Sequence, residues 1–301
     1  MDLAAGDPAI RRTETHLRGA EGGRGAPLLF RRGWLPERPW GALLVVHGYA
    51  EHSGRYEELG AWFASRGLAV EAYDQRGHGR SEGLQCHVDR FGEFLDDLDR
   101  VLERVREEHA ALPVVLVGHS MGGLVVSAFL ADRRPTVAGA VTSGAALAVG
   151  PGVSRGRLAA ARLMRRLAPR LALGSGLDPA GLSRDPEVVR RYLEDPLVYR
   201  TMTTSLAAEL LGAIPAVAAR AVEVQVPMLL LHGSDDPLCP IEGSRAFHGG
   251  VRVPGSAFRA YPGLRHEIFN EPERDAVFGD LLEWLRATLR PESGRGAPGG
   301  Q

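Results

Sequence analysis

Residues 114–130 read VVLVGHSMGGLVVSAFL and determine the fold class of this chain. The apolar run at the start predicts a strand buried on both faces, and the run after Gly122 predicts a helix. The turn between them holds Ser120 between Gly118 and Gly122, which is the GxSxG pattern of a nucleophile elbow. Glycines at these positions let the strand and the helix approach closely around a strained serine. The stretch therefore predicts a Ser120 hydroxyl raised above the end of a sheet.

The same alternation of strand and helix extends along the chain in both directions. Short apolar runs bounded by Gly, Pro or Asp are typical of strands covered on both faces. Residues 91–108 carry an apolar stripe with a period of 3.6 residues, as expected of an amphipathic helix. Strands that alternate with helices indicate βαβ units, so we expect an α/β fold with a mostly parallel central sheet flanked by helices. The expected strands are residues 42–46, 68–73, 114–117, 137–142 and 228–231.

One long segment interrupts this alternation. Between residues 145 and 210, Arg-rich helical stretches are broken by Gly and Pro. We interpret 145–210 as a helical cap inserted into a core formed by residues 13–144 and 211–290. The polar residues 1–12 and the glycine-rich tail 291–301 are expected to be disordered.

Composition narrows the class of protein. The chain has 36 Lys and Arg against 37 Asp and Glu, with a sequence pI near 6.8, which argues against nucleic acid as a partner. Only Cys86 and Cys239 are present, as suits a reducing compartment. Charges interrupt the N-terminal residues, and no apolar run reaches the length of a membrane span. We expect an intracellular protein that contacts a membrane at most at its surface; the sequence does not predict its oligomeric state.

An acid and a base follow two later predicted strands. Residues 232–240 read HGSDDPLCP, which offers Asp235 or Asp236 as the acid, and GLRHE at 263–267 offers His266 as the base. The order Ser, Asp, His is that of the α/β hydrolases. The N–H groups of Tyr49 and Met121 are expected to bind the oxyanion that develops during acyl transfer. We read His47, beside them, as a histidine that braces the loop.

Two other patterns resemble cofactor sites without matching them. Gly77, Gly79 and Gly83 miss the dinucleotide spacing GxGxxG by one residue. His266 and Glu267 begin an HExxH zinc motif, but Asn270 stands where the second His belongs. We predict neither a metal nor any other cofactor.

Several motifs together resemble the monoacylglycerol lipase and lysophospholipase-like branch of the α/β hydrolases, with its serine aminopeptidase S33-type hydrolase domain. The similarity covers most of residues 30–290. The motifs are HGYAEHSGRYEELGAWFASRGLAVEAYDQRGHGRSEG (47–83), HVDRF (87–91), GHSMGG (118–123), SRDPEVVRRYLEDPL (183–197), HGSDDPLC (232–239) and YPGLRHEIFNE (261–271). The resemblance implies an α/β-hydrolase fold with an inserted helical cap.

The resemblance also implies roles for individual residues. It selects Asp236 rather than Asp235 to complete the triad with Ser120 and His266, and it supports Tyr49 and Met121 as the oxyanion donors. It places Glu51, Arg55 and Tyr192 around the glycerol head group of the substrate. From the residues themselves, a salt bridge that braces the loop explains Glu51 and Arg55 equally well. Packing in the cap is the alternative role for Tyr192.

Two residues near the predicted site have less defined roles. Cys239 matches a position near the active site in some relatives, but a small buried apolar residue explains it as well. Tyr49 departs from the family pattern, in which the residue after HG is usually small. We expect its side chain to affect the preference for acyl-chain length.

The function implied is ester hydrolysis through an acyl-enzyme, with monoacylglycerol cleaved to glycerol and fatty acid. A lysophospholipase, a short-chain carboxylesterase and a peptidase on the same triad are alternatives. A noncatalytic ligand-binding protein is the alternative from another class. Residues 153–173 combine leucines with many arginines at helical spacing, so this segment either rests on anionic lipid or simply covers the pocket.

Overall fold

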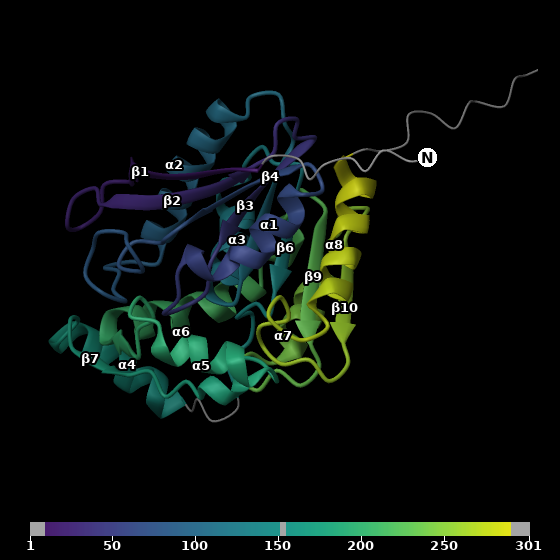
Figure 1. The fold of residues 1–301 in the computed structure, drawn as a ribbon. Coiled ribbons are helices and arrows are strands. Elements are labelled where there is room, and N and C mark those ends of the chain that lie inside the picture. Colours follow the sequence, from purple (N-terminus) through teal and green to yellow (C-terminus); the bar gives the residue numbers. More distant parts are fainter. Residues whose placement is uncertain (1–9, 151–154, 290–301) are drawn as a thin grey trace, which may run out of the picture.

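The computed structural model describes residues 10–150 and 155–289 and contains one eight-stranded sheet (Figure 1). The strands lie side by side in the order β1-β2-β4-β3-β5-β6-β9-β10. From β4 to β10 neighbouring strands are parallel, whereas β1 and β2 join the edge in antiparallel pairs. The strands are β1 (Arg11–Arg18), β2 (Leu28–Leu35), β3 (Gly41–Val46), β4 (Leu68–Tyr73), β5 (Val114–His119), β6 (Gly139–Ser143), β9 (Met228–Gly233) and β10 (Ala257–Tyr261).

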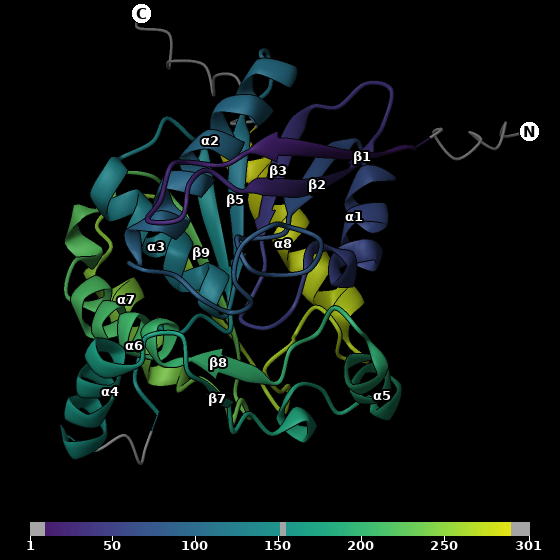
Figure 2. The ribbon, with the colours of Figure 1, turned by 90° about the vertical axis from the view of Figure 1, so that its left-hand side faces the viewer.

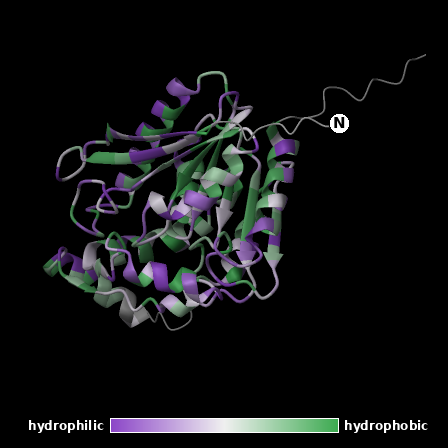
Figure 3. Ribbon diagram, in the orientation of Figure 1, coloured by the Kyte–Doolittle hydropathy of each residue, from purple (hydrophilic) through white to green (hydrophobic). Residues whose placement is uncertain are grey.

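Helices cover both faces of the sheet, as Figures 1 and 2 show from two sides. The helices α1 (Glu57–Ala64) and α8 (Arg274–Leu289) contribute to one core, and α2 (Gly92–Glu108), α3 (Met121–Arg133) and α7 (Ile241–Gly250) contribute to the other. Successive strand residues divide between these two cores. In β3, Leu44 and Val46 pack into the core that contains α3, whereas Leu43 and Val45 pack into the core that contains α1 and α8. The predicted α/β fold with a mostly parallel sheet is confirmed, and Figure 3 shows its central strands mostly in the hydrophobic colour.

The antiparallel hairpin at the sheet edge was not predicted. Arg11 and Arg12, which the sequence placed in a disordered N-terminus, pair with Leu35 and Trp34 in β1 and β2. The disorder expectation is wrong for these two residues, because β1 is an exposed, charged edge strand without an apolar run. The remaining residues expected to be disordered, 1–10 and 291–301, lie outside the described residues apart from residue 10.

The chain between β6 and β9 crosses the carboxyl ends of the parallel strands (Figures 1 and 2). This segment contains a two-stranded antiparallel ribbon of β7 and β8, and its last helix, α6, packs against both α3 and α4. The expected cap boundary at residue 210 falls inside α6. No helix in the described part of the chain is long and apolar enough to cross a bilayer. The elements are α4 (Arg155–Leu167), β7 (Ala172–Gly174), η2 (Pro179–Gly181), α5 (Pro186–Glu194), β8 (Thr201–Thr203), α6 (Thr204–Ala218) and η3 (Ala221–Glu223); η1 (Ser53–Tyr56) precedes α1.

Candidate active site

Ser120 occupies the sharp turn that joins β5 to α3. Its backbone has φ 52° and ψ −116°, a left-handed conformation that costs a residue with a side chain about 1–3 kcal/mol. A Cβ at position 122 would overlap the carbonyl oxygens of Val46 and His47, so only glycine allows α3 to pass this close to β3. The N–H of Ser120 donates to the carbonyl of Ser143 on β6 at 2.9 Å, which fixes the turn to the sheet. This strained turn thus places Ser120 at the carboxyl ends of the parallel strands.

The loops after β9 and β10 bring one aspartate and one histidine together. Asp236 Oδ2 lies 2.8 Å from His266 Nδ1, whereas the exposed Asp235 accepts a hydrogen bond from the hydroxyl of Ser234. The backbone N–H groups of Leu238 and Cys239 donate to Asp236 Oδ1 at 2.8 and 3.0 Å. Of the two candidate acids, the structure therefore places Asp236 beside the histidine.

His232 is a second partner of Asp236 that the sequence analysis missed. Its Nε2 lies 3.0 Å from Asp236 Oδ2 and 3.0 Å from the carbonyl oxygen of Cys239, so this nitrogen carries the proton. Burial raises the pKa of Asp236, but hydrogen bonds from His232 and His266 outweigh it and hold that pKa well below its usual range. The carboxylate is therefore ionised at neutral pH. The histidine that begins the HGSDDPLC motif was the available signal.

The environment of His266 favours its protonated form. Burial lowers the pKa of the imidazole, but the hydrogen bond and the negative charge of Asp236 outweigh burial and raise this pKa above its ordinary value. With Nδ1–H donated to Asp236, Nε2 carries the lone pair, and it has no hydrogen-bond partner in the described ranges. His266 and Ser120 line the same cavity. The imidazole thus has the tautomer that a general base requires.

The two predicted oxyanion donors lie at the carboxyl ends of neighbouring strands. Tyr49 follows the end of β3, and Met121 is the first residue of α3. Neither backbone N–H donates a hydrogen bond to any residue that the structure describes. The helix dipole of α3 adds a partial positive charge at Met121. Free donors at a helix N-terminus suit the binding of a developing oxyanion.

Two side chains hold the loop that carries Tyr49. Glu51 Oε1 accepts the Gly48 N–H at 2.6 Å and the hydroxyl of Tyr56 at 2.8 Å. The Nε2 of His47 accepts the N–H of Gln75 at 2.8 Å, and Gln75 Nε2 donates to the carbonyl of His47 at 2.7 Å. These contacts agree with the interpretation of His47 as a bracing residue. They also set the orientation of the Tyr49 peptide.

A cavity of about 120 Å³ lies over Ser120 between the sheet edge and the cap. Its polar lining residues Glu51, Arg55, His119 and Glu267 lie close to one another and form a polar side. Its apolar lining residues include Leu177, Leu182, Leu238 and Cys239. Tyr49 and Tyr192 also line the cavity. A cavity lined by both polar and apolar residues suits an ester that joins a polar alcohol to an acyl chain.

The polar side contains a buried charge network. Arg55 donates through both terminal nitrogens to Glu267, at 2.7 and 2.8 Å, and its Nη1 also lies 3.4 Å from Glu51. The guanidinium lies 4.7 Å from the centre of the Tyr192 ring, which extends the network to α5 of the cap. The predicted residues Glu51, Arg55 and Tyr192 therefore meet in one place. The salt bridge between Glu51 and Arg55 exists, and both side chains also line the cavity.

Glu267 and His119 were not predicted as site residues. Glu267 follows the base directly in sequence but pairs with a residue 212 positions away, which no local pattern reveals. His119 precedes Ser120, its ring centre lies 4.8 Å from that of His266, and its Nδ1 lies 3.0 Å from the carbonyl oxygen of Ser143. Burial lowers the pKa of His119 to about 4, so this histidine is neutral at pH 7.

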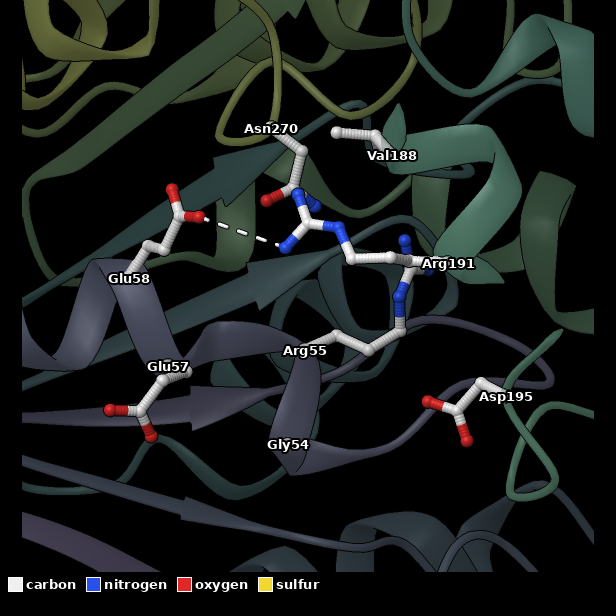
Figure 4. A pocket seen from close by; sticks show the side chains of 8 residues that line it. All are labelled: Gly54, Arg55, Glu57, Glu58, Val188, Arg191, Asp195 and Asn270. Carbon is white, nitrogen blue, oxygen red and sulfur yellow. Dashed lines mark ion pairs between the residues drawn. The ribbon is translucent and has the colours of Figure 1, made fainter. Parts of the chain in front are cut away.

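Arg55 separates the catalytic cavity from a second pocket on the surface. This outer pocket has a volume of about 160 Å³ and lies between η1, α1 and α5 (Figure 4). The largely buried Arg55 lines both pockets, and the exposed Glu58 and Arg191 form an ion pair of 3.9 Å at the outer one, which Asn270 also lines. Asn270 also donates to Glu267 at 2.9 Å. The Arg55–Glu267 pair is thus a partition between the catalytic cavity and solvent.

One group of metal-binding residue types lies outside this site. Glu71, Glu108 and His109 approach one another in the described part of the chain. Arg31 Nη2 lies 3.3 Å from Glu71 and 2.6 Å from Glu108. The guanidinium therefore already compensates these carboxylates, and we assign no metal to them.

Comparison with known proteins agrees with this arrangement. The family model described as "Serine aminopeptidase, S33" matches residues 37–273. A monoacylglycerol lipase of Mycolicibacterium smegmatis is 38% identical over 258 residues, which cover 85% of this chain and 92% of that protein. The phospholipase YtpA of Bacillus subtilis is 32% identical over 81% of this chain and 95% of its own length. The crystal structure of Paleococcus ferrophilus monoacylglycerol lipase is 34% identical, with a TM-score of 0.78 and coverage of 86% of this chain and 99% of that one.

Proposed function

The chain belongs to the serine aminopeptidase S33 family of α/β hydrolases, and on that basis we propose that it hydrolyses monoacylglycerols to glycerol and free fatty acid. The observation that carries the proposal is the cavity over Ser120, which is lined both by a buried cluster of Arg55 with two carboxylates and by three leucines. Such a cavity matches an ester of a small polar alcohol and an apolar acyl chain.

The proposed mechanism uses an acyl-enzyme. Ser120 Oγ attacks the ester carbonyl while His266 Nε2 takes its proton, and the N–H groups of Tyr49 and Met121 bind the oxyanion. Asp236 holds the imidazole by the 2.8 Å hydrogen bond to Nδ1. His266 then protonates the departing glycerol, and a water molecule deprotonated by the same imidazole releases the fatty acid.

The charge on the polar side favours a neutral alcohol over a phosphate. Glu51 and Glu267 contribute two carboxylates, and the guanidinium between them is already held by both of its terminal nitrogens. A phosphodiester in the leaving group would add a negative charge beside these carboxylates. Hydroxyl groups of a diol can instead donate to Glu51 and Glu267, and Tyr192 borders the same space. We therefore favour glycerol esters over lysophospholipids, the substrates of the strongest alternative.

The substrate class can be tested with one set of assays. Fatty-acid release is measured from a long-chain monoacylglycerol, the matching lysophospholipid and a nitrophenyl butyrate, by wild type and by Ser120→Ala. We expect preferential cleavage of the monoacylglycerol by wild type and loss of all activity in the variant. Faster release from the lysophospholipid, or activity on the butyrate alone, would replace the assignment with the corresponding alternative. Binding of these lipids without turnover would support a noncatalytic ligand-binding protein.

The cap provides a surface suited to contact with lipid. Four exposed leucines follow one another closely in the sequence, from the end of α4 to β7: Leu163, Leu167, Leu171 and Leu173. Arg166 and Arg170 are exposed among them and have no ion-pair partner in the described ranges. Leucines and free guanidinium groups on one surface favour transient binding to an anionic membrane. With the thiols of Cys86 and Cys239 both free, we place the protein in the cytoplasm with peripheral membrane contact.

A further inference from the structure

Glu267 is a buried carboxylate that the proposed acyl transfer does not itself use. It receives two hydrogen bonds from Arg55 and one, at 2.9 Å, from Asn270 Nδ2. Its backbone N–H donates to the carbonyl of Leu182 in the cap at 2.8 Å. Burial raises the pKa of Glu267, but the charge and hydrogen bonds of Arg55 outweigh burial and lower it. The side chain is therefore a fixed negative charge one residue from His266.

The groups around His266 carry an excess of negative charge. Asp236, from the loop after β9, is hydrogen-bonded to the imidazole, and Glu51, from the loop after β3, and Glu267, from its own loop, line the same cavity as His266. Among the described residues that line this cavity, Arg55 is the one guanidinium, and it pairs with Glu51 and Glu267. The other titratable neighbours are His119, which is neutral at pH 7, and His232, which acts through Asp236. Burial raises the pKa values of Tyr192 and Cys239, so both are also uncharged.

A continuous chain of contacts links Glu267 to the oxyanion loop. Arg55 joins Glu267 to Glu51, and Glu51 receives the N–H of Gly48, the residue before Tyr49. The residue after the base, the residue before the predicted oxyanion donor and the cap residue Tyr192 are therefore held by one network. A displacement of about 1 Å in such a network can reduce a rate about 100-fold.

We propose that Glu267 is a positioning residue for catalysis: through Arg55 and Glu51 it holds the oxyanion loop against the base, and its charge stabilises the imidazolium formed on His266 during acyl transfer. This inference rests on the proposed role of His266 as general base. It concerns how that base is controlled and does not depend on which ester is the substrate.

The decisive variant is Glu267→Gln, which preserves size and removes the charge. The kcat/KM of wild type for a soluble nitrophenyl ester falls at low pH, because a protonated His266 cannot act as base. Without the negative charge of residue 267 the imidazolium is less stable, so this fall moves to lower pH. We expect kcat to drop about 10- to 100-fold, with little change in KM.

A double variant separates charge from position. Arg55→Met with Glu267→Met removes one positive and one negative charge, so the net charge near His266 is unchanged. It also avoids leaving an unpaired buried ion. We expect a loss in kcat similar to that of Glu267→Gln but a pH profile close to that of wild type. Glu58→Gln on the solvent side of Arg55 is the matched control, and it should keep both the wild-type rate and the wild-type profile.

The outcomes distinguish this inference from the proposed function. Absence of wild-type ester hydrolysis would contradict the proposed function. An active wild type with unchanged kcat and pH profile in Glu267→Gln would overturn the inference, and so would a lower kcat without a shift of the acid limb. Imidazole titration by NMR, with the His266 signal identified by its loss in His266→Asn, tests the charge effect without turnover. If Glu267→Gln does not fold, Glu51→Gln removes a carboxylate from the other end of the network, and an unshifted His266 titration in that variant would reject the charge effect.

Discussion

Two adjacent aspartates after β9 have different surroundings in this chain. Asp236 receives two backbone N–H groups and lies against His266, whereas Asp235 is exposed and contacts Ser234. The sequence offered both, and spacing alone did not separate them. The resemblance to a known family selected the residue that the structure places beside the imidazole.

This difference predicts very different effects for one substitution at the two positions. Asp236→Asn should lower kcat about 10⁴-fold, because an amide no longer holds the catalytic tautomer of His266. Asp235→Asn should leave kcat within a few-fold of wild type. Steady-state hydrolysis of a nitrophenyl ester measures both variants. Equal losses would show that the acid has been assigned to the wrong residue.

At the scale of elements, apolar runs located the parallel strands because these strands are covered on both faces. The strand β4, for example, spans Leu68–Tyr73 as expected. The hairpin of β1 and β2 escaped prediction because β1 is mostly exposed, so hydrophobicity does not mark it. The glycines of GxSxG predicted that α3 packs closely against the sheet, but they did not identify β3 as the strand that it contacts.

That contact predicts a structural cost for adding one methyl group. Gly122→Ala places a Cβ against the carbonyl oxygens of Val46 and His47, and we expect the free energy of unfolding to fall by about 1–3 kcal/mol. Gly279→Ala on the exposed face of α8 is the matched control. It meets no atom within 4 Å and should raise stability by about 0.5–1 kcal/mol. Denaturant unfolding of both variants compares the two effects, and equal changes would refute the packing argument.

The cap surface makes a prediction about association with lipid. Leu163→Gln combined with Leu167→Gln should weaken binding to vesicles of anionic phospholipid about 10-fold or more, because two exposed leucines no longer enter the lipid. Val222→Gln, at another exposed apolar residue, should have no effect. Vesicle sedimentation at constant salt measures both. Unchanged binding of the double variant would contradict the lipid contact and favour the alternative that this segment only covers the pocket.

At the scale of the whole molecule, the sequence predicted the position of the site in the fold, but it did not predict the charge network around that site. Ser120, Asp236 and His266 each follow a strand, and parallel strands bring such positions to one edge of the sheet. The bond of Arg55 with Glu267 joins residues 212 positions apart. No period or spacing signals a pair of that kind, so the charge network emerges only from the fold.

The insertion of the cap between β6 and β9 has an evolutionary consequence. The paired residues Ala140 and Met228 are 228 − 140 = 88 positions apart, and the chain between them leaves the end of β6 and returns to the neighbouring strand β9. The entropy of closing such a loop grows only with the logarithm of its length, so doubling it costs about 0.6 kcal/mol. The length of this segment can therefore change between α4 and α5 at little thermodynamic cost, whereas α6 is held by its packing against α3. Substrate range in this architecture can diversify while the strands and the triad stay fixed.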